Sequence, residues 1–193
     1  IELIGQNYPD ENIAKERWYG GEFSITYQDH VGDFNYYASA NWSCEQSKVL
    51  YKDEQKVPYE YLRTTGKPKG AIFGLVAEGF FTSQDEITKS PVIEGFNNIQ
   101  PGDIKYKDLD GDKKITEKDR TVIGKNFPSW TGGLNLSVGY KNFDLSALFQ
   151  GAFDVDGYYT AEAAYAFYNG ATALKRHLDR WTPDNHNASY PRV

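Results

Sequence analysis

The sequence comprises 193 residues, enough to bury the core of one or two domains. Aromatic residues make up 16% of it, yet the mean hydropathy is −0.66, so large flat side chains are set in an otherwise polar chain. The net charge is −6 and no basic stripe occurs, which excludes the positive surface that nucleic-acid binding requires.

A first β-hairpin is predicted over residues 20–45. In 21-GEFSITYQDH-30, and again in 34-FNYYASANWS-43, large apolar side chains alternate with small polar ones. This period of two is typical of a strand with one apolar face. Because a short turn containing Gly32 separates the two runs, we expect the strands to pair as a hairpin.

The next segment, 51–128, is rich in Lys, Gly, Pro and Asp and is predicted to form mostly loops. Within it, 108-DLDGDKKITEKD-119 has the spacing of a calcium loop, in which oxygen ligands come from positions 1, 3, 5, 7, 9 and 12. Ile115 would be the buried anchor of this loop, and the ion would have a structural role. The predicted ligands are Asp108, Asp110, Asp112, the Lys114 carbonyl, Thr116 and Asp119.

Two departures from the calcium pattern leave a second interpretation open. Lys113 stands where an EF-hand has glycine, and Asp119 is shorter than the usual glutamate. Asp-Gly clusters also form ordinary turns, and Thr116 followed by Asp119 resembles a helix N-cap with its acidic partner. The segment therefore predicts either a calcium loop or a capped turn.

A second hairpin of the same design is predicted over 130–152. The runs 132-GGLNLSVGY-140 and 143-FDLSALFQG-151 alternate as the first pair does, on either side of a turn at Lys141 and Asn142. The final segment, 154–193, is predicted to be mostly loop. Within it, 160–181 carries helix-favouring residues, interrupted at Asn169-Gly170, and predicts a short helix.

Two folds fit four strands of this kind. In a soluble β-sandwich the apolar faces cover a core, whereas in a transmembrane barrel they contact lipid and the polar faces line a wet lumen. The polar faces here carry Ser, Asn, Thr, Gln and Gly in place of the Lys and Glu that protect exposed strands of soluble proteins. Aromatic residues also lie toward the strand ends, so the pattern favours the barrel.

Four separated motifs give the chain a resemblance to a known family. From about Gly20 to Val193 it resembles the C-terminal part of the SusC/RagA-type TonB-dependent outer-membrane transporters. The motifs are 64-TTGKPKGAIFGLVAEGFF-81, 101-PGDIKYKDLDGDKKITEKDRTVIG-124, 132-GGLNLSVGYKNFDLSALFQG-151, and 179-DRWTPDN-185 with 190-YPRV-193.

The resemblance implies an all-β fold: antiparallel strands from a transmembrane barrel of roughly 22 strands, with long extracellular loops and a short helix. Residues 51–128 and 154–193 would be those loops. In the family, a SusD-like surface lipoprotein covers the barrel, glycans or peptides are captured between the two, and TonB drives import. The plug and the TonB box belong to the N-terminal part of the family, which we expect to lie outside this chain.

We therefore expect part of an outer-membrane transporter for glycans or other large nutrients, surrounded by outer-membrane lipid. No pair of carboxylates is singled out as glycosidase chemistry would require, so we do not expect an enzyme. The alternative is a soluble β-rich module that uses calcium to brace a glycan-binding surface.

Overall fold

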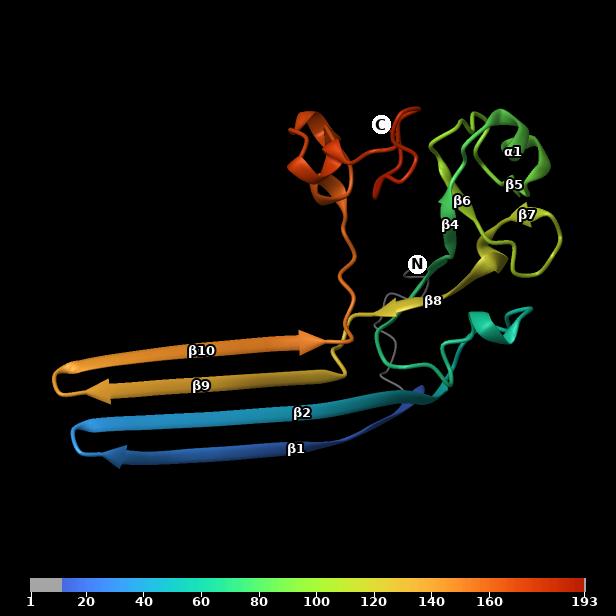
Figure 1. The fold of residues 1–193 in the computed structure, drawn as a ribbon. Helices are drawn as coiled ribbons and strands as arrows, with labels where there is room; N and C mark the ends of the chain where they lie inside the picture. The colour runs from blue at the N-terminus through green and yellow to red at the C-terminus, as the bar shows by residue number, and fades with distance from the viewer. Residues whose placement is uncertain (1–11, 193) are drawn as a thin grey trace, which may run out of the picture. The chain divides into compact units, whose positions relative to one another are not determined.

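A computed structural model describes residues 12–192, which form two compact units (Figure 1). The sheet unit comprises the chain up to Lys56, Arg63–Ala71 and Lys125–Asp156. The loop unit comprises Val57–Leu62, Ile72–Gly124 and the chain from Gly157. The chain thus passes several times from one unit to the other.

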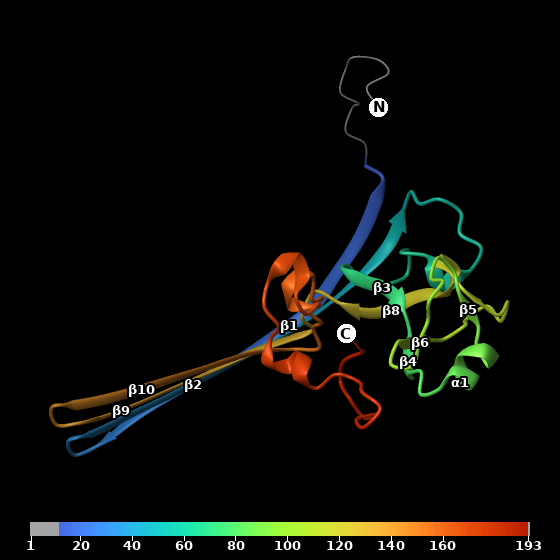
Figure 2. The ribbon, with the colours of Figure 1, turned by 90° about the horizontal axis from the view of Figure 1, so that it is seen from above.

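The sheet unit is built on four antiparallel strands in the order β1-β2-β9-β10. Figure 2, viewed from above, shows these strands as one thin layer. Tight turns at Gly32 and at Lys141 join the strands within each hairpin, and both residues have positive φ, 60° and 53°. The strands are β1 (Ala14–Val31), β2 (Phe34–Lys52), β9 (Trp130–Tyr140) and β10 (Phe143–Phe153).

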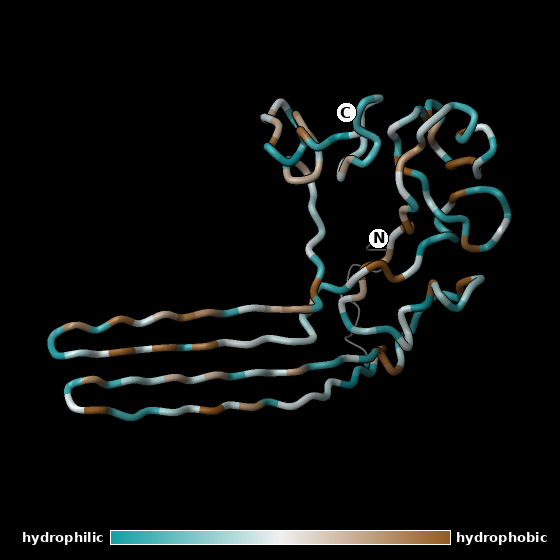
Figure 3. Tube along the Cα trace, viewed as in Figure 1, coloured by the Kyte–Doolittle hydropathy of each residue, from teal (hydrophilic) through white to brown (hydrophobic). Residues whose placement is uncertain are grey.

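The register places the apolar side chains of all four strands on one face. Ile25 lies opposite Ala40, Ala40 opposite Leu134, and Leu134 opposite Phe149. Directly opposite residues point to the same side of a sheet, and side chains alternate between its two sides along each strand. The residues two positions before and after these four therefore lie on the same apolar face. Figure 3 shows the resulting alternation of apolar and polar residues along the strands.

The first hairpin is longer than the sequence predicted. It starts at Ala14 and ends at Lys52, beyond both ends of 20–45. Residues 14–19 mix charged and aromatic side chains without alternation, so periodicity gave no signal there. Their backbones nevertheless pair with β2, with one register shift between Lys15 and Glu16.

The loop unit contains short strand pairs around a small core. Phe81, Ile93 and Ile115 are buried together, and Leu75 and Tyr106 are among the side chains that pack against them. The pairs are β3 (Ala71–Leu75) with β8 (Arg120–Lys125), β4 (Ala77–Phe80) with β6 (Ile104–Tyr106), and β5 (Val92–Ile93) with β7 (Lys114–Ile115). The last pair is parallel.

The single α-helix of residues 12–192 is α1 (Gln84–Lys89), which begins where the Ser83 side chain accepts a hydrogen bond from the Glu86 amide (3.2 Å). No helix in this described part has the length and apolar composition needed to cross a membrane.

The helix predicted within 160–181 is wrong. The structure has three short 3₁₀ turns there: η3 (Ala161–Ala163), η4 (Tyr168–Gly170) and η5 (Lys175–Leu178). Phe167 and Asn169 have left-handed backbones, with φ of 61° and 48°, which an α-helix cannot contain. Helix propensity was therefore overridden by local geometry.

Candidate functional site

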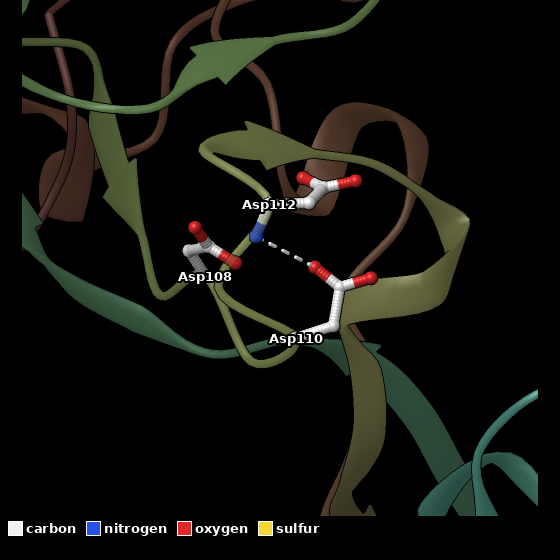
Figure 4. Close-up of side chains that lie close together, drawn as sticks. All are labelled: Asp108, Asp110 and Asp112. Carbon is white, nitrogen blue, oxygen red and sulfur yellow. Dashed lines mark hydrogen bonds between the residues drawn. The ribbon is translucent and has the colours of Figure 1, made fainter.

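The acidic loop 108–119 brings three of its predicted ligands together. Figure 4 shows the side chains of Asp108, Asp110 and Asp112, and one carboxylate oxygen from each lies within 4.8 Å of the others. They are at alternate positions of the chain between β6 and β7. Three oxygens at this separation match part of the coordination shell of a calcium ion.

Backbone amides hold these carboxylates in place. Asp108 accepts hydrogen bonds from the amides of Gly111 (2.7 Å) and Lys113 (2.9 Å). Asp110 accepts one from the Asp112 amide (3.1 Å), and Asp112 one from the Lys114 amide (2.8 Å). The chain therefore winds around its own side chains, as Asp residues favour in turns.

Lys113 adopts the conformation that the calcium pattern requires at this position. Its φ is 63°, in the left-handed region where an EF-hand loop uses glycine. Gly111, two residues earlier, also has positive φ, 78°. The loop thus makes its sharp turn despite the lysine.

Asp119 is fully buried and lies outside the cluster of three carboxylates. Its two oxygens accept hydrogen bonds from the amides of Leu109 and Thr116, both at 2.8 Å, which tie the start of the loop to its end. With Thr116 it forms a capping box on η2 (Glu117–Asp119), as the alternative interpretation predicted. Ile115 is only 3% exposed and anchors the loop in the core.

Two tyrosines that the sequence did not indicate also belong to this site. The Tyr59 hydroxyl donates a hydrogen bond to Asp110 (3.0 Å), and the Tyr61 ring stacks on Tyr59 with centroids 5.2 Å apart. Both lie in or beside η1 (Glu60–Leu62), about fifty positions before the loop, so spacing gave no signal.

The charge of the loop acts on both phenols. The pKa of Tyr59 is raised, first by its hydrogen bond to Asp110 and then by burial and the negative charge of the loop. The pKa of Tyr61 is raised first by burial and then by the charge of Asp110. The negative charge of the loop carboxylates is thus one of the causes of both shifts.

The four-stranded sheet is the second candidate site, and aromatic groups mark the two ends of its apolar face. At the end away from the hairpin turns, the Trp42 ring lies 5.9 Å from the rings of both Trp130 and Phe153. At the turn end, the rings of Phe34 and Tyr36 lie 6.0 Å apart. Phe34 and Trp42 are eight residues apart in β2, or about 26 Å at about 3.3 Å per residue.

The opposite face of the sheet is polar. Thr26 and Ser39 form a hydrogen bond between side chains across the strands (2.9 Å), and Ser137 and Ser146 form another (3.0 Å). Near the turns this face has a shallow recess whose lining includes Gln28, His30, Asn35, Tyr37 and Asp144. The sheet therefore has one apolar and one polar face.

Comparisons with known proteins find relatives of one class, the TonB-dependent receptors. No family model matches the chain. TonB-dependent receptor P3 of Formosa agariphila is 25% identical over 99% of the chain, and TonB-dependent receptor P26 of the same organism is 28% identical over 98%. The chain spans 20% of the length of each of these relatives.

Solved structures of the RagAB peptide transporter have the same fold. One matches the whole chain with a TM-score of 0.64 at 18% identity, and the closed-closed state of the RagAB peptide importer matches with a TM-score of 0.57. In both, the chain covers 22% of the matched protein. The all-β fold predicted from the sequence is thereby confirmed.

The names of these proteins can be compared with two further predictions, that the chain is not an enzyme and that it lies in the outer membrane. They are receptors and a transporter, which agrees with the prediction that the chain is not an enzyme. Such proteins lie in the outer membrane, which confirms the expected location. The chain is thus similar over nearly its whole length to TonB-dependent receptors, as its motifs indicated, and it has the fold of part of the RagAB transporter structures.

Proposed function

We propose that this chain is part of a TonB-dependent transporter, in which β1, β2, β9 and β10 form part of the barrel wall. The observation that carries the proposal is the shared register, which puts the apolar residues of four strands on one face and small polar residues on the other. The nine residues from Phe34 to Trp42 agree with the about 9 to 11 residues that a tilted membrane-spanning strand needs.

Charged residues support the same placement. Beyond Trp42, away from the turns, β1 and β2 continue as a ribbon that would leave the membrane. Within this extension, charged side chains become frequent: Lys15, Glu16, Arg17, Glu22, Glu45 and Lys48. The hairpin turns would then lie on the periplasmic side, and the loop unit outside the cell.

The alternative, a soluble calcium-braced module, does not fit the sheet. The apolar side chains of the sheet remain exposed to solvent, and the exposed fraction of Phe143 is 81%. A soluble sandwich would cover this face with a second sheet, whereas the other strand pairs among residues 12–192 are only two strands wide. Lipid is the environment that these side chains suit.

The proposal also covers the substrate and the partners of the transporter. The transporter would import glycans, peptides or other large nutrients, together with a SusD-like surface lipoprotein, with energy supplied through TonB. The RagAB structures, which are of a peptide transporter, favour peptides as one substrate class to examine.

Spin labels on neighbouring residues of β9 test the placement in the membrane. In a Cys44→Ser background, cysteines are introduced at Leu136 or at Asn135 of the full chain as the cell produces it, and labelled in lipid vesicles. We expect the label at 136 to be accessible to oxygen dissolved in lipid, and the label at 135 to a water-soluble nickel reagent. If the label at 136 is shielded from both reagents, it lies in a protein core and the barrel is wrong.

We further propose that the acidic loop binds calcium through Asp108, Asp110 and Asp112, with the Lys114 carbonyl and Thr116 as further ligands. Asp119, the sixth ligand predicted from the spacing, would instead hold the two ends of the loop together through the Leu109 and Thr116 amides. The converging carboxylates, the left-handed Lys113 and the buried Ile115 support this proposal. The ion would be structural, because it would neutralise mutual repulsion in the loop and fix the connection between β6 and β8.

Calcium titration of the purified protein tests the site. We expect calcium to raise the melting temperature, and Asp110→Ala to abolish this rise and weaken calcium binding at least tenfold. Asp85→Ala is the matched control, because Asp85 lies on the surface of α1 and pairs only with Lys89 (3.1 Å). A melting temperature that chelator leaves unchanged would contradict the calcium site and leave the capped turn as the interpretation.

A further inference from the structure

The apolar face of the sheet continues, beyond its aromatic groups, into a pair of positively charged residues. In β2, every second residue from Trp42 to Lys48 belongs to this face. Arg17 of β1 lies directly opposite Lys48 and therefore points to the same side of the ribbon. The register shift of the ribbon comes only after this pair, so the alternation holds as far as Arg17.

Between Trp42 and the register shift, the charged residues of the ribbon are sorted by sign. Glu16, Glu22 and Glu45 alternate with the residues of the apolar face, so their side chains point to the polar side. On that side, Glu16 forms an ion pair with Lys69. The side that continues the apolar face carries only positive charge in this part of the ribbon.

Arg17 and Lys48 have no carboxylate that offsets their charge in the described part of the chain. Both residues are exposed, and neither forms an ion pair within residues 12–192. Directly opposite residues of antiparallel strands have Cβ atoms about 5 Å apart, and like charges at this separation destabilise the pair. An anion bound between the two side chains would remove this repulsion.

In a barrel wall, this pair lies at the level of the lipid headgroups. Trp130 and Phe153 share a row with Cys44 at the outer end of the apolar face. Lys48 follows four residues later in β2, about 13 Å along the strand, or about 9 Å farther from the membrane centre at a tilt of about 45°. The headgroup layer is about 5 to 8 Å thick on each side, and long basic side chains bend back toward it.

The apolar face also has a groove that fits an acyl chain. Phe23, Trp42, Gly132 and Gly151 form one row across the four strands. Because the two glycines have no side chains, β9 and β10 are hollowed beside the Trp42 indole. The groove has a volume of about 460 Å³, and Leu134 is part of its lining.

We propose that Arg17 and Lys48 bind the phosphate of a lipid in the outer leaflet, with one of its acyl chains in the groove beside Trp42. The inference rests on the proposed placement of the four strands in the barrel wall. A phosphate accepts two hydrogen bonds from an arginine fork and a further one from a lysine ammonium, each strengthened by charge. The bound lipid stabilises the ribbon where it leaves the membrane, because two attractions replace the repulsion between the cations.

Native mass spectrometry of the full chain as the cell produces it, purified in neutral detergent, tests the proposal. The protein is titrated with dimyristoyl phosphatidic acid, with dimyristoylglycerol, which has the same chains without phosphate, and with glycerol 3-phosphate, which has the headgroup without chains. We expect the protein to retain phosphatidic acid alone. Retention of glycerol 3-phosphate at the same concentration would overturn the lipid in favour of free phosphate.

Charge variants locate the site. Arg17→Gln with Lys48→Gln should weaken the retention of phosphatidic acid at least about tenfold, the effect of losing charge-assisted hydrogen bonds. Arg17→Lys keeps the charge and should retain most of the binding. Lys107→Gln with Lys118→Gln is the matched control, because it removes the same charge from exposed residues of the loop unit.

Two results would overturn the lipid site without touching the barrel. One is equal retention of phosphatidic acid and dimyristoylglycerol by the unchanged protein, and the other is an equal loss of binding in the two double variants. The spin labels on β9 report on the barrel wall independently. A label at 136 that contacts lipid, together with either of these results, would remove this inference alone.

Discussion

Lys113 has a left-handed backbone, which a residue with a Cβ adopts at a cost of about 1 kcal/mol. Its side chain is exposed and is not one of the calcium ligands proposed here. We therefore expect Lys113→Gly to relieve this strain and to raise the free energy of unfolding by up to about 1 kcal/mol, measured as a higher melting temperature.

Lys114→Gly is the control for this change. Lys114 is the next residue, lies in β7 and has no positive φ, so glycine relieves no strain there and should destabilise the loop slightly. If Lys113→Gly melts at or below the temperature of the original protein, as Lys114→Gly should, the conformation of Lys113 does not cost the loop stability.

Glu54 makes the segment that follows β2 sensitive to acid. It accepts hydrogen bonds from the amides of Thr64 (2.8 Å) and Thr65 (3.1 Å). The pKa of its carboxyl is lowered from 4.5 to about 2, chiefly by the hydrogen bond from the Thr65 side chain. A lowered pKa means that the carboxylate stabilises the fold above about pH 4.5, and that this contribution is lost as the pH falls toward 2.

Hydrogen exchange at Thr64 and Thr65 measures this effect. Allowing for solvent screening, we expect these amides to lose about 1 to 2 kcal/mol of protection between pH 5 and pH 2, and Glu54→Gln to remove the pH dependence. Protection that is the same at both pH values in the original protein would show that Glu54 does not hold this turn.

At the scale of single residues, sequence spacing predicted the contacts between residues that are close together in the chain. Asp108, Asp110 and Asp112 are two positions apart, so one turn of chain brings them together, and the structure does so. Tyr59 reaches Asp110 from a segment far away in the chain, and the His177 ring packs against Tyr190 only after the chain folds. Contacts of this kind depend on tertiary structure, and no spacing in one sequence encodes them.

At the scale of elements, two adjacent glycines of β1 have different roles. A Cβ on Gly20 would lie 2.0 Å from the backbone oxygen of Cys44 in β2, whereas a Cβ on Gly21 would meet nothing within 4 Å. Gly20→Ala must therefore push the two strands apart and should cost about 1 to 3 kcal/mol. Gly21→Ala should change stability by less than about 1 kcal/mol.

Heat-dependent migration on detergent gels compares the two glycine variants. We expect the temperature at which the folded form disappears to fall for Gly20→Ala and to stay close to the original for Gly21→Ala. An equal effect of both substitutions would mean that the close approach of β1 and β2 at Gly20 does not constrain the sheet.

The elements that were predicted well are those with a strict period. The cores of both hairpins alternate because one face contacts an apolar environment, and that alternation is visible in the sequence. The ribbon at 14–19 and the turns within 160–181 lack such a face, so propensity was the only guide there. Propensity failed where Phe167 and Asn169 adopt left-handed backbones.

At the scale of the whole molecule, the sheet is incomplete by itself. Within residues 12–192, β1 pairs only with β2 and β10 only with β9, so both edges of the sheet are open. Open edges and an uncovered apolar face are tolerated in a barrel wall, where further strands and lipid cover them. In water they promote association between chains.

We therefore expect the 193-residue chain, expressed alone, to aggregate in plain buffer and to stay dispersed only in detergent, as measured by light scattering. Replacing Leu134, Leu136 and Val138 with Thr should reduce aggregation, because these side chains form the apolar face of β9. Asn135→Thr with Ser137→Thr, on the polar face of the same strand, should leave it unchanged. A monodisperse monomer in plain buffer with a cooperative melt would contradict this expectation, because such a chain would have to bury these side chains in a core of its own.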